Sequence, residues 1–162
     1  MILDRPATLE VAQAHILRAG LTARVAVQPG NALTDDLGTG YDLVLISNVI
    51  HAYTEFENRR LLSRAARALK PGGNLAVKDF FFNDDRTGPP GVGLFAINML
   101  VNTAEGDCYP LAVVKEWLRL SGVRRIKTFA LEPPSTLLVG STRAAKPTGE
   151  PLVAVTESAS PT

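Results

Sequence analysis

Two side chains, one just beyond an apolar run and one near the end of the next run, have the chemistry of a general base and its partner. His51 lies four positions beyond the run Tyr41–Ser47, and Asp79 lies near the end of the run 74–82. An imidazole changes its charge near neutral pH, so it can take a proton from a substrate hydroxyl, and a carboxylate can hold the ring in one orientation. We therefore treat His51 as a candidate base and Asp79 as its orienting partner. A structural histidine at a strand–helix junction is the alternative interpretation.

Three further polar residues, Asp4, Asn31 and Ser47, lie at or just beyond the ends of short apolar runs. An acidic residue that ends a strand can accept hydrogen bonds from both hydroxyls of a nucleotide ribose, and an Asn side chain can address an adenine edge. The alternatives are that Asp4 caps the following helix and that Asn31 belongs to a turn. Ligands of open α/β sheets bind outside the carboxyl ends of the strands, so these residues and His51 are expected along the same rim of the sheet.

The elements that must position these residues alternate between strand and helix signals. Tyr41–Ser47 is typical of a buried strand, and the capping-box pattern from Thr54 to Glu57 indicates the start of a helix. We expect strands near 24–28, 42–47, 74–81, 124–131 and 136–141, and helices near 9–19, 54–69, 94–102 and 110–121. The alternation predicts an α/β fold with a largely parallel sheet and an antiparallel final hairpin, in which 41–47 and 74–81 are parallel neighbours.

Composition excludes several classes of protein. The chain has 162 residues, a net charge of +1, one cysteine and two histidines. These counts rule out an internal disulfide framework and a cysteine-rich zinc site, and they give no charge-based reason to expect nucleic acid or an anionic membrane. The sequence has no apolar run long enough for a membrane helix and no secretion signal at its start, so we expect a cytoplasmic protein.

Other segments carry no predicted chemistry. The pairs Asp35-Asp36 and Asp84-Asp85 lie in turn-rich stretches without further ligands, so no metal site is expected. Gly88–Gly93 lacks the form of a phosphate-binding loop and is interpreted as a connector. Residues 1–142 are expected to form one domain. The Ala-, Pro-, Thr- and Ser-rich stretch 143–162 is expected to be a disordered tail.

The order of motifs resembles one known family. The run YDLVLISNVIHAYTEFENRRLLSRAARALKPGG, followed by NLAVKDFF and later by LFAINMLVNTAEGDCY, is similar to the S-adenosylmethionine-dependent O-methyltransferases of the plant caffeate and bacterial polyketide type. The resemblance covers about residues 1–141. It implies a Rossmann-like class I methyltransferase sheet, S-adenosylmethionine as cofactor, and a small hydroxylated substrate.

The resemblance also implies roles for particular residues near the base. His51 matches the family's catalytic base, and Asp79 matches an acidic residue that orients it. Asn98 and Met99 match the segment that lines the substrate. Cys108 stands where plant members place a second acidic residue beside the histidine, so that support is absent or moved here.

A second group of matches concerns the cofactor. Asp4 matches the ribose-binding acid, and Asn31, with Ala32 beside it, stands where the family more often has an Asp near the adenine. Ser47 stands where plant members carry a lysine near the cofactor carboxylate.

The chain departs from the family pattern at its start, since it begins at the equivalent of the second strand. The family's dimerisation domain, first strand and glycine-rich loop have no counterpart, so the homodimer of the family is not expected to form in the same way. We interpret the chain as a partial domain for methyl transfer to a hydroxyl of an aromatic or polyketide-like molecule. The alternatives are a non-catalytic remnant or binding module and, less supported, a nicotinamide dehydrogenase, against which the absence of a GxGxxG loop argues.

Overall fold

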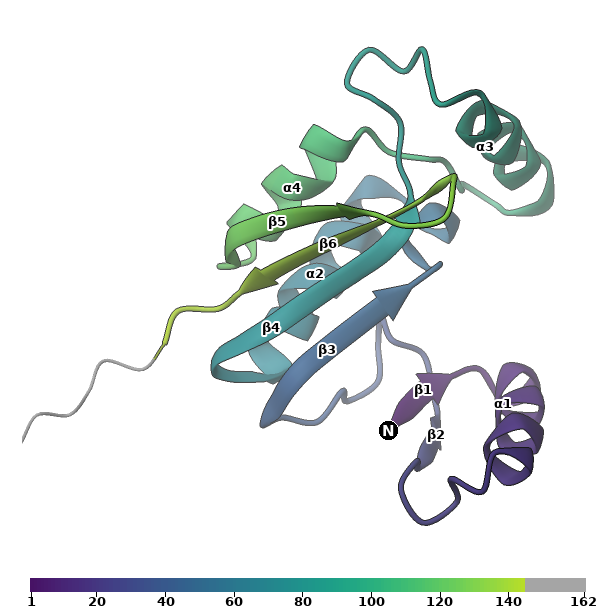
Figure 1. Ribbon diagram of the computed structural model, residues 1–162, viewed down its shortest axis with the longest axis vertical. Coiled ribbons are helices and arrows are strands. Elements are labelled where there is room, and N and C mark those ends of the chain that lie inside the picture. Colours follow the sequence, from purple (N-terminus) through teal and green to yellow (C-terminus); the bar gives the residue numbers. More distant parts are fainter. Residues whose placement is uncertain (145–162) are drawn as a thin grey trace, which may run out of the picture.

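The computed structural model describes residues 1–144, which form two sheets and four α-helices (Figure 1). The elements along the chain are β1 (Ile2–Asp4), α1 (Pro6–Arg18), β2 (Val27–Pro29), β3 (Tyr41–Ser47), the short 3-10 helix η1 (Ile50–Ala52), α2 (Glu55–Ala68), β4 (Leu69–Phe80), α3 (Pro90–Asn102), α4 (Leu111–Leu120), β5 (Arg124–Ala130) and β6 (Ser135–Ser141).

The main sheet has the strand order β3-β4-β6-β5. β3 and β4 pair in parallel, with Val44 opposite Leu75 and Ile46 opposite Val77. β6 is antiparallel to both β4 and β5. The predicted parallel neighbours and the predicted final hairpin are therefore confirmed.

β1 and β2 form a separate two-stranded parallel sheet. The prediction of a strand near 24–28 in the main sheet was wrong in its bounds and in its sheet. The backbone N–H groups of Arg24 and Val25 both donate to the carbonyl of Leu21, at 2.9 Å, so these residues belong to a turn after α1 and the strand begins at Val27. Its pairing with β1 is short, from Ile2–Val27 to Asp4–Pro29.

The segment Pro71-Gly72-Gly73 lies within β4, where the sequence predicted a helix end and a strand start at residue 74. α2 ends at Ala68, and the pairing of β4 with β3 is interrupted by an irregularity between Tyr41 and Leu43. A Cβ on Gly73 would lie 3.0 Å from the carbonyl oxygens of Lys70 and Tyr41. Glycine therefore allows the two strands to approach closely where the register shifts.

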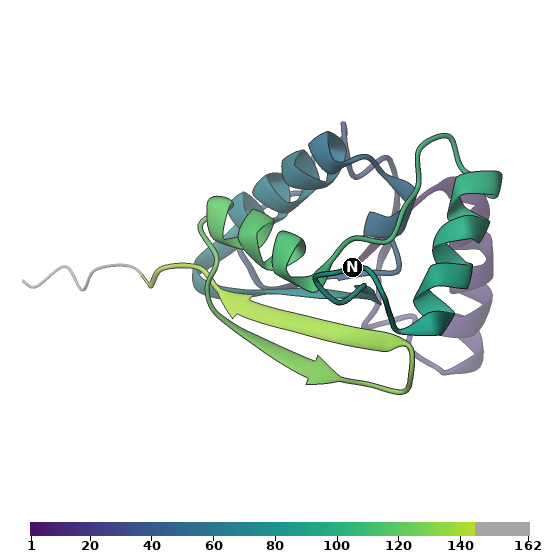
Figure 2. The same ribbon diagram turned by 90° about the horizontal axis from the view of Figure 1, so that it is seen from above.

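Helices α2 and α4 cover one face of the main sheet, as Figure 2 shows from above. The predicted capping box begins α2: the Thr54 hydroxyl accepts from the Glu57 N–H at 3.2 Å, and the Glu57 carboxylate accepts from the Thr54 N–H at 3.0 Å. The core between helices and sheet contains fully or almost fully buried apolar side chains, among them Leu62, Leu75, Val77, Val114, Trp117, Leu118 and Leu138.

Helix α3 begins at Pro90, four residues earlier than predicted, so the second half of the expected connector Gly88–Gly93 is helical. Proline at the first helical position has no N–H to satisfy and a φ suited to a helix, which explains the start. The outer side of α3 exposes four large apolar side chains, those of Leu94, Ile97, Leu100 and Val101. Across residues 1–144 no helix has the length and apolar character that crossing a membrane requires. Apart from Arg143 and Ala144, the predicted tail lies outside the described residues.

Candidate functional site

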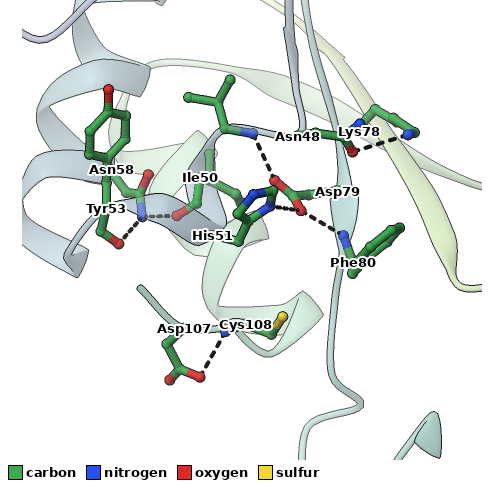
Figure 3. Close-up of polar contacts among 11 residues, drawn as sticks. Asn48, Ile50, His51, Tyr53, Asn58, Lys78, Asp79, Phe80, Asp107 and Cys108 are labelled. Atoms are coloured by element: carbon green, nitrogen blue, oxygen red, sulfur yellow. Dashed lines mark hydrogen bonds and ion pairs between the residues drawn. The ribbon is translucent and has the colours of Figure 1, made fainter. Parts of the chain in front are cut away.

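His51 and Asp79 lie side by side beyond the carboxyl end of β3 (Figure 3). The chain leaves β3 at Asn48, which has a positive φ of 54° that Asn tolerates, and turns into η1, which carries His51. Asp79 is the penultimate residue of β4. The distance from Nδ1 of His51 to Oδ1 of Asp79 is 2.7 Å, and the side chains are 13% and 1% exposed. The structure therefore brings together the two residues that the sequence proposed as base and partner.

The Asp79 carboxylate accepts hydrogen bonds from two backbone N–H groups as well as from the ring. Phe80 N donates to Oδ1 at 2.8 Å, and Val49 N donates to Oδ2 at 3.2 Å. Because a carboxylate only accepts, we assign the proton of the neutral imidazole to Nδ1 of His51, which leaves Nε2 with its lone pair. Nε2 has no partner within residues 1–144 and is not enclosed there, so it is available to a ligand.

The backbone on either side of His51 is also fixed. The side chain of Asn58, buried on α2, donates to the carbonyls of Ile50 at 2.8 Å and Tyr53 at 3.0 Å. Asp107 N donates to the carbonyl of His51 at 3.0 Å. A Cβ on Gly106 would lie 2.6 Å from that same carbonyl oxygen, so the loop packs tightly behind the imidazole. The position of the ring thus depends on three separate elements of the chain.

Aromatic side chains pack beside the pair. The ring of Phe95 on α3 meets the imidazole of His51 edge to face, with centroids 4.8 Å apart, and Phe80 meets Phe95 at 4.7 Å. The sequence reasoning missed Phe95. The signal was available, because Phe95 precedes the predicted Asn98 and Met99 by three and four residues, the spacing that places side chains on one side of a helix.

Asn98 and Met99 themselves make no contact with His51 among the interactions of the described residues. Asn98 is exposed, and its side-chain oxygen accepts from the side chain of Asn102 at 2.7 Å. Met99 is half-buried, and its carbonyl accepts from Thr103. The structure thus places both predicted substrate-lining residues on α3, one turn beyond the residue that touches the base.

Cys108 lies buried near the pair. Burial, with the negative charges of Asp79 and Asp107, raises the pKa of its thiol to about 12. Burial and the charge of Asp107 likewise raise the pKa of the Tyr109 hydroxyl to about 12, and that hydroxyl donates to the carbonyl of Tyr53 at 2.6 Å. Both groups are neutral at neutral pH, so neither competes with His51 for a proton.

A cavity of about 470 Å³, which we call the seam, lies between the two sheets. Its flanks are β1 and β3, and its lining includes Ile2, Leu3, Asp4, Ala32, Leu43, Leu45, Ser47, Leu61, Ala65 and Ala68. Three of the four predicted cofactor-binding residues, Asp4, Ala32 and Ser47, therefore border one cavity. Ala32 is tied to α2, since its carbonyl accepts from Nε of Arg64 at 3.2 Å.

Asn31 does not line the seam. Its side-chain oxygen accepts from the N–H of Leu33 at 2.9 Å, and its own N–H donates to the carboxylate of Asp35 at 2.9 Å. These bonds are turn chemistry, the alternative that the sequence left open. The Asp4 carboxylate accepts from the N–H of Arg5 at 2.7 Å through one oxygen, which leaves the other oxygen without a partner in the described part of the chain.

The described residues contain no group of three or more His, Cys, Asp or Glu side chains arranged to hold a metal ion. The chemistry that the geometry offers is proton transfer at His51 and hydrogen bonding at Asp4 and Ser47. Asp4 and Ser47 are the last residues of parallel strands and His51 lies just beyond one, at the edge of the sheet where open α/β sheets bind their ligands.

The fold and the site thus define a class of proteins in which a Rossmann-like α/β sheet carries a histidine–carboxylate pair on its rim. Residues 1–120 match the O-methyltransferase domain family, and the chain belongs to it. The chain is 32% identical over 133 residues to a 3-hydroxy-5-methyl-1-naphthoate 3-O-methyltransferase of Streptomyces sahachiroi, a match of 82% of this chain and 38% of that protein. It is 34% identical over 122 residues to an L-tyrosine C(3)-methyltransferase of Streptomyces lavendulae, covering 75% and 33%.

Solved structures agree with this assignment. An O-methyltransferase family protein from Burkholderia thailandensis superposes with a TM-score of 0.83 at 28% identity, over 90% of this chain and 44% of that one. Human N-acetylserotonin methyltransferase, solved in complex with SAM, gives a TM-score of 0.76 at 25% identity, over 88% and 40%. The fold is that of the Rossmann-like methyltransferases, and the chain spans about two fifths of the length of these relatives.

Proposed function

We propose that this chain carries the proton-abstracting half of an S-adenosylmethionine-dependent O-methyltransferase acting on a small aromatic or polyketide-like hydroxyl compound. The observation that carries the proposal is the 2.7 Å hydrogen bond between His51 and the buried Asp79, with Nε2 of the ring left open. Membership of the O-methyltransferase family supports it. The naphthoate substrate named for the Streptomyces sahachiroi relative supports the class of acceptor.

His51 removes the hydroxyl proton in this proposal. Nε2 accepts the proton while Nδ1–H stays bonded to Asp79, and the ring becomes positively charged. The Asp79 carboxylate, held by the N–H groups of Val49 and Phe80, stabilises that charge at close range. A positioned base of this kind contributes roughly 10²–10⁴-fold to a rate.

The residues at the rim of the seam fit the cofactor. The free oxygen of Asp4 can accept from ribose hydroxyls, Ala32 offers a small apolar surface, and Ser47 offers a hydroxyl at the end of β3. The cavity has the size of typical cofactor sites, roughly 300–1,000 Å³. S-adenosylmethionine supplies an electrophilic methyl group when bound.

The surroundings of His51 suit an aromatic acceptor. Phe95 and Phe80 form an apolar wall beside the ring, and the half-buried Met99 follows Phe95 by one helical turn. Such a wall binds an apolar ring through burial and edge-to-face contacts, and Met adapts to its shape. The polar group that the substrate must bring to Nε2 is its hydroxyl.

Methyl transfer from radiolabelled S-adenosylmethionine to hydroxynaphthoates and hydroxyflavones tests the proposal. In a polypeptide that joins this chain to the part of a family member that it does not match, we expect transfer, and a loss of about 10²-fold or more in His51→Ala. His15→Ala is the matched control, since His15 lies exposed on α1 and its ring contacts Arg18. Loss of transfer in both variants, or in neither, would contradict the role of His51.

A second candidate is a chain that folds but does not transfer methyl groups by itself. The seam separates Asp4 from Ser47, and the chain spans about two fifths of its relatives. Calorimetric titration with S-adenosylmethionine distinguishes the two candidates. Absence of both binding and transfer in the isolated, folded chain would favour the second.

A further inference from the structure

The segment 105–108 lies behind His51 and holds the carbonyl of that residue. Asp107 donates its backbone N–H to the His51 carbonyl oxygen at 3.0 Å. The segment belongs to no helix or strand, so the placement of this N–H depends on contacts with other parts of the chain. One such contact is with the end of α3, because the N–H of Gly106 donates to the Thr103 hydroxyl at 2.7 Å.

Arg86 supplies a second set of contacts to the segment. Its Nη2 donates to Oδ2 of Asp107 at 2.6 Å and to the carbonyl of Cys108 at 2.9 Å. The other carboxylate oxygen of Asp107, Oδ1, accepts from the N–H of Cys108 at 2.7 Å (Figure 3). Hydrogen bonds between charged groups are roughly twice as strong as neutral ones. A continuous set of hydrogen bonds therefore runs from the Arg86 guanidinium through Asp107 to the backbone of His51.

The loop 83–88 holds Arg86 in a defined place. The loop is closed at its base, because Asn83 N donates to the Gly88 carbonyl and Gly88 N donates to the Asn83 side-chain oxygen, both at 2.9 Å. Arg86 has a φ of 59°, which a residue with a long side chain adopts only at a cost. Its guanidinium carbon lies 5.3 Å from the centroid of the Phe82 ring, and Phe82 is 8% exposed. A strained backbone and a buried aromatic neighbour both fix the guanidinium, which favours a positioning role over an incidental surface ion pair.

We propose that Arg86 is a positioning residue for His51 and acts through Asp107, whose N–H holds the His51 carbonyl. This inference rests on the proposed function, in which His51 is the base. The side chains of Arg86 and Asp107 are 48% and 37% exposed, so their ion pair contributes little to global stability. Its effect is local. Without it the segment 105–108 opens more often, the His51 carbonyl loses its donor more often, and the imidazole keeps its bond to Asp79 less constantly.

NMR spectroscopy of the whole chain tests this effect in Arg86→Met, which keeps an apolar stem beside the Phe82 ring and removes the guanidinium. We expect hydrogen exchange at the Asp107 amide and at Nδ1 of His51 to become about tenfold faster. The melting temperature is expected to fall by no more than about 4 °C, since a half-exposed ion pair contributes little to the unfolding free energy.

Two further variants isolate the contact. Arg119→Met is the matched control, because Arg119 is 52% exposed and pairs with Glu116 on α4 at 3.2 Å. It is expected to change neither exchange rate. Asp107→Asn removes the charge of the other partner and is expected to reproduce the effect of Arg86→Met. The double variant is expected to show no larger change than either single variant, because both remove the same interaction.

The joined polypeptide of the transfer assay measures the consequence for the reaction. Arg86→Met is expected to lower kcat by roughly 5–10-fold and to leave the KM for S-adenosylmethionine unchanged, because a misplaced base affects the transition state and not the binding of the cofactor.

Several results would overturn the inference. They are an unchanged exchange rate at Nδ1 of His51 in Arg86→Met, an equal change in Arg119→Met, a larger change in the double variant, and the same acceleration at the amides of β4 and β6. An unchanged kcat in Arg86→Met would also overturn it where His51→Ala abolishes transfer. If His51→Ala retains transfer, the proposed function fails, and the exchange rates still decide whether Arg86 places the imidazole.

Discussion

Replacing Asp79 with Asn tests how strongly the buried carboxylate holds the site together. Asn has nearly the same shape as Asp, so the packing is preserved. One of the two oxygens that accept hydrogen bonds is replaced by an NH₂ group, which donates. Its single oxygen can take the place of Oδ1 and keep the bonds from His51 and Phe80. Its NH₂ group then faces the N–H of Val49, which donated to Oδ2 at 3.2 Å, and two donors oppose each other.

The cost follows from these contacts. A buried donor that loses its partner costs about 1–3 kcal/mol, and the two remaining bonds lose the strengthening that a charged acceptor gives. We expect the free energy of unfolding to fall by about 2–4 kcal/mol. For a chain of this length that lowers the melting temperature by about 5–15 °C. Thermal and urea unfolding followed by circular dichroism measure both quantities.

Asp42→Asn provides the matched control. Asp42 lies on β3, its side chain is 86% exposed, and its carboxylate pairs with Lys70 at 2.9 Å. Exposed ion pairs of this kind contribute about 0–1 kcal/mol, so the same chemical change there should have little effect. If Asp79→Asn were as stable as Asp42→Asn, the hydrogen-bond network around Asp79 would not be the stabilising feature described above.

Local changes elsewhere test the capping box, the packing behind His51 and the buried thiol. Thr54→Ala should lower the unfolding free energy by about 1 kcal/mol in urea titrations, because the N-cap acceptor is lost. Gly106→Ala should lower it by about 1–3 kcal/mol, because the new Cβ meets the His51 carbonyl, whereas Gly93→Ala, whose nearest neighbour is 4.0 Å away, should not lower it. The free energy of unfolding should fall as pH rises from about 9 towards 12. The Cys108 thiol ionises near its ordinary pKa in the unfolded chain but stays protonated in the folded chain. Rising pH therefore favours the unfolded state, which loses the proton first. Cys108→Ala should flatten the decline of the urea midpoint between pH 8 and 10, and an unchanged slope would contradict the raised pKa of the thiol.

Most of the main sheet was predictable because its signals are local. The apolar run Tyr41–Ser47 and the capping box at Thr54 specify a strand and a helix start within a few residues, and parallel pairing follows from the crossover rule. The bounds and the sheet of the strand expected near 24–28 could not be predicted, because a strand of three paired residues leaves too weak an apolar pattern in the sequence. The register irregularity near Tyr41 could not be predicted either, since it depends on the close approach of two strands that are distant in sequence.

The site was predictable to the extent that it follows from topology. The carboxyl ends of β3 and β4 lie together, so His51 and Asp79 were expected to be neighbours, and they are. The role of Asn31 was not fixed by its position, because Asn serves turns and ligands equally well. The spacing of Phe95 to Asn98 and Met99 indicates one side of a helix, and the tertiary placement of α3 then brings that side to the imidazole.

The seam also divides the chain into parts that can open independently. Asp79 lies on β4, between β3 and β6, so separating it from His51 requires disruption of the middle of the main sheet. Asp4 lies on a two-stranded sheet with short pairing, which can unfold locally at much lower free energy. Amide exchange would then report two cooperative units, a slow one around the base and a fast one around Asp4. Part of the binding free energy of a ligand held by Asp4 would be used to fold the unit around Asp4. The apparent affinity of the ligand would therefore rise with every change that stabilises that unit.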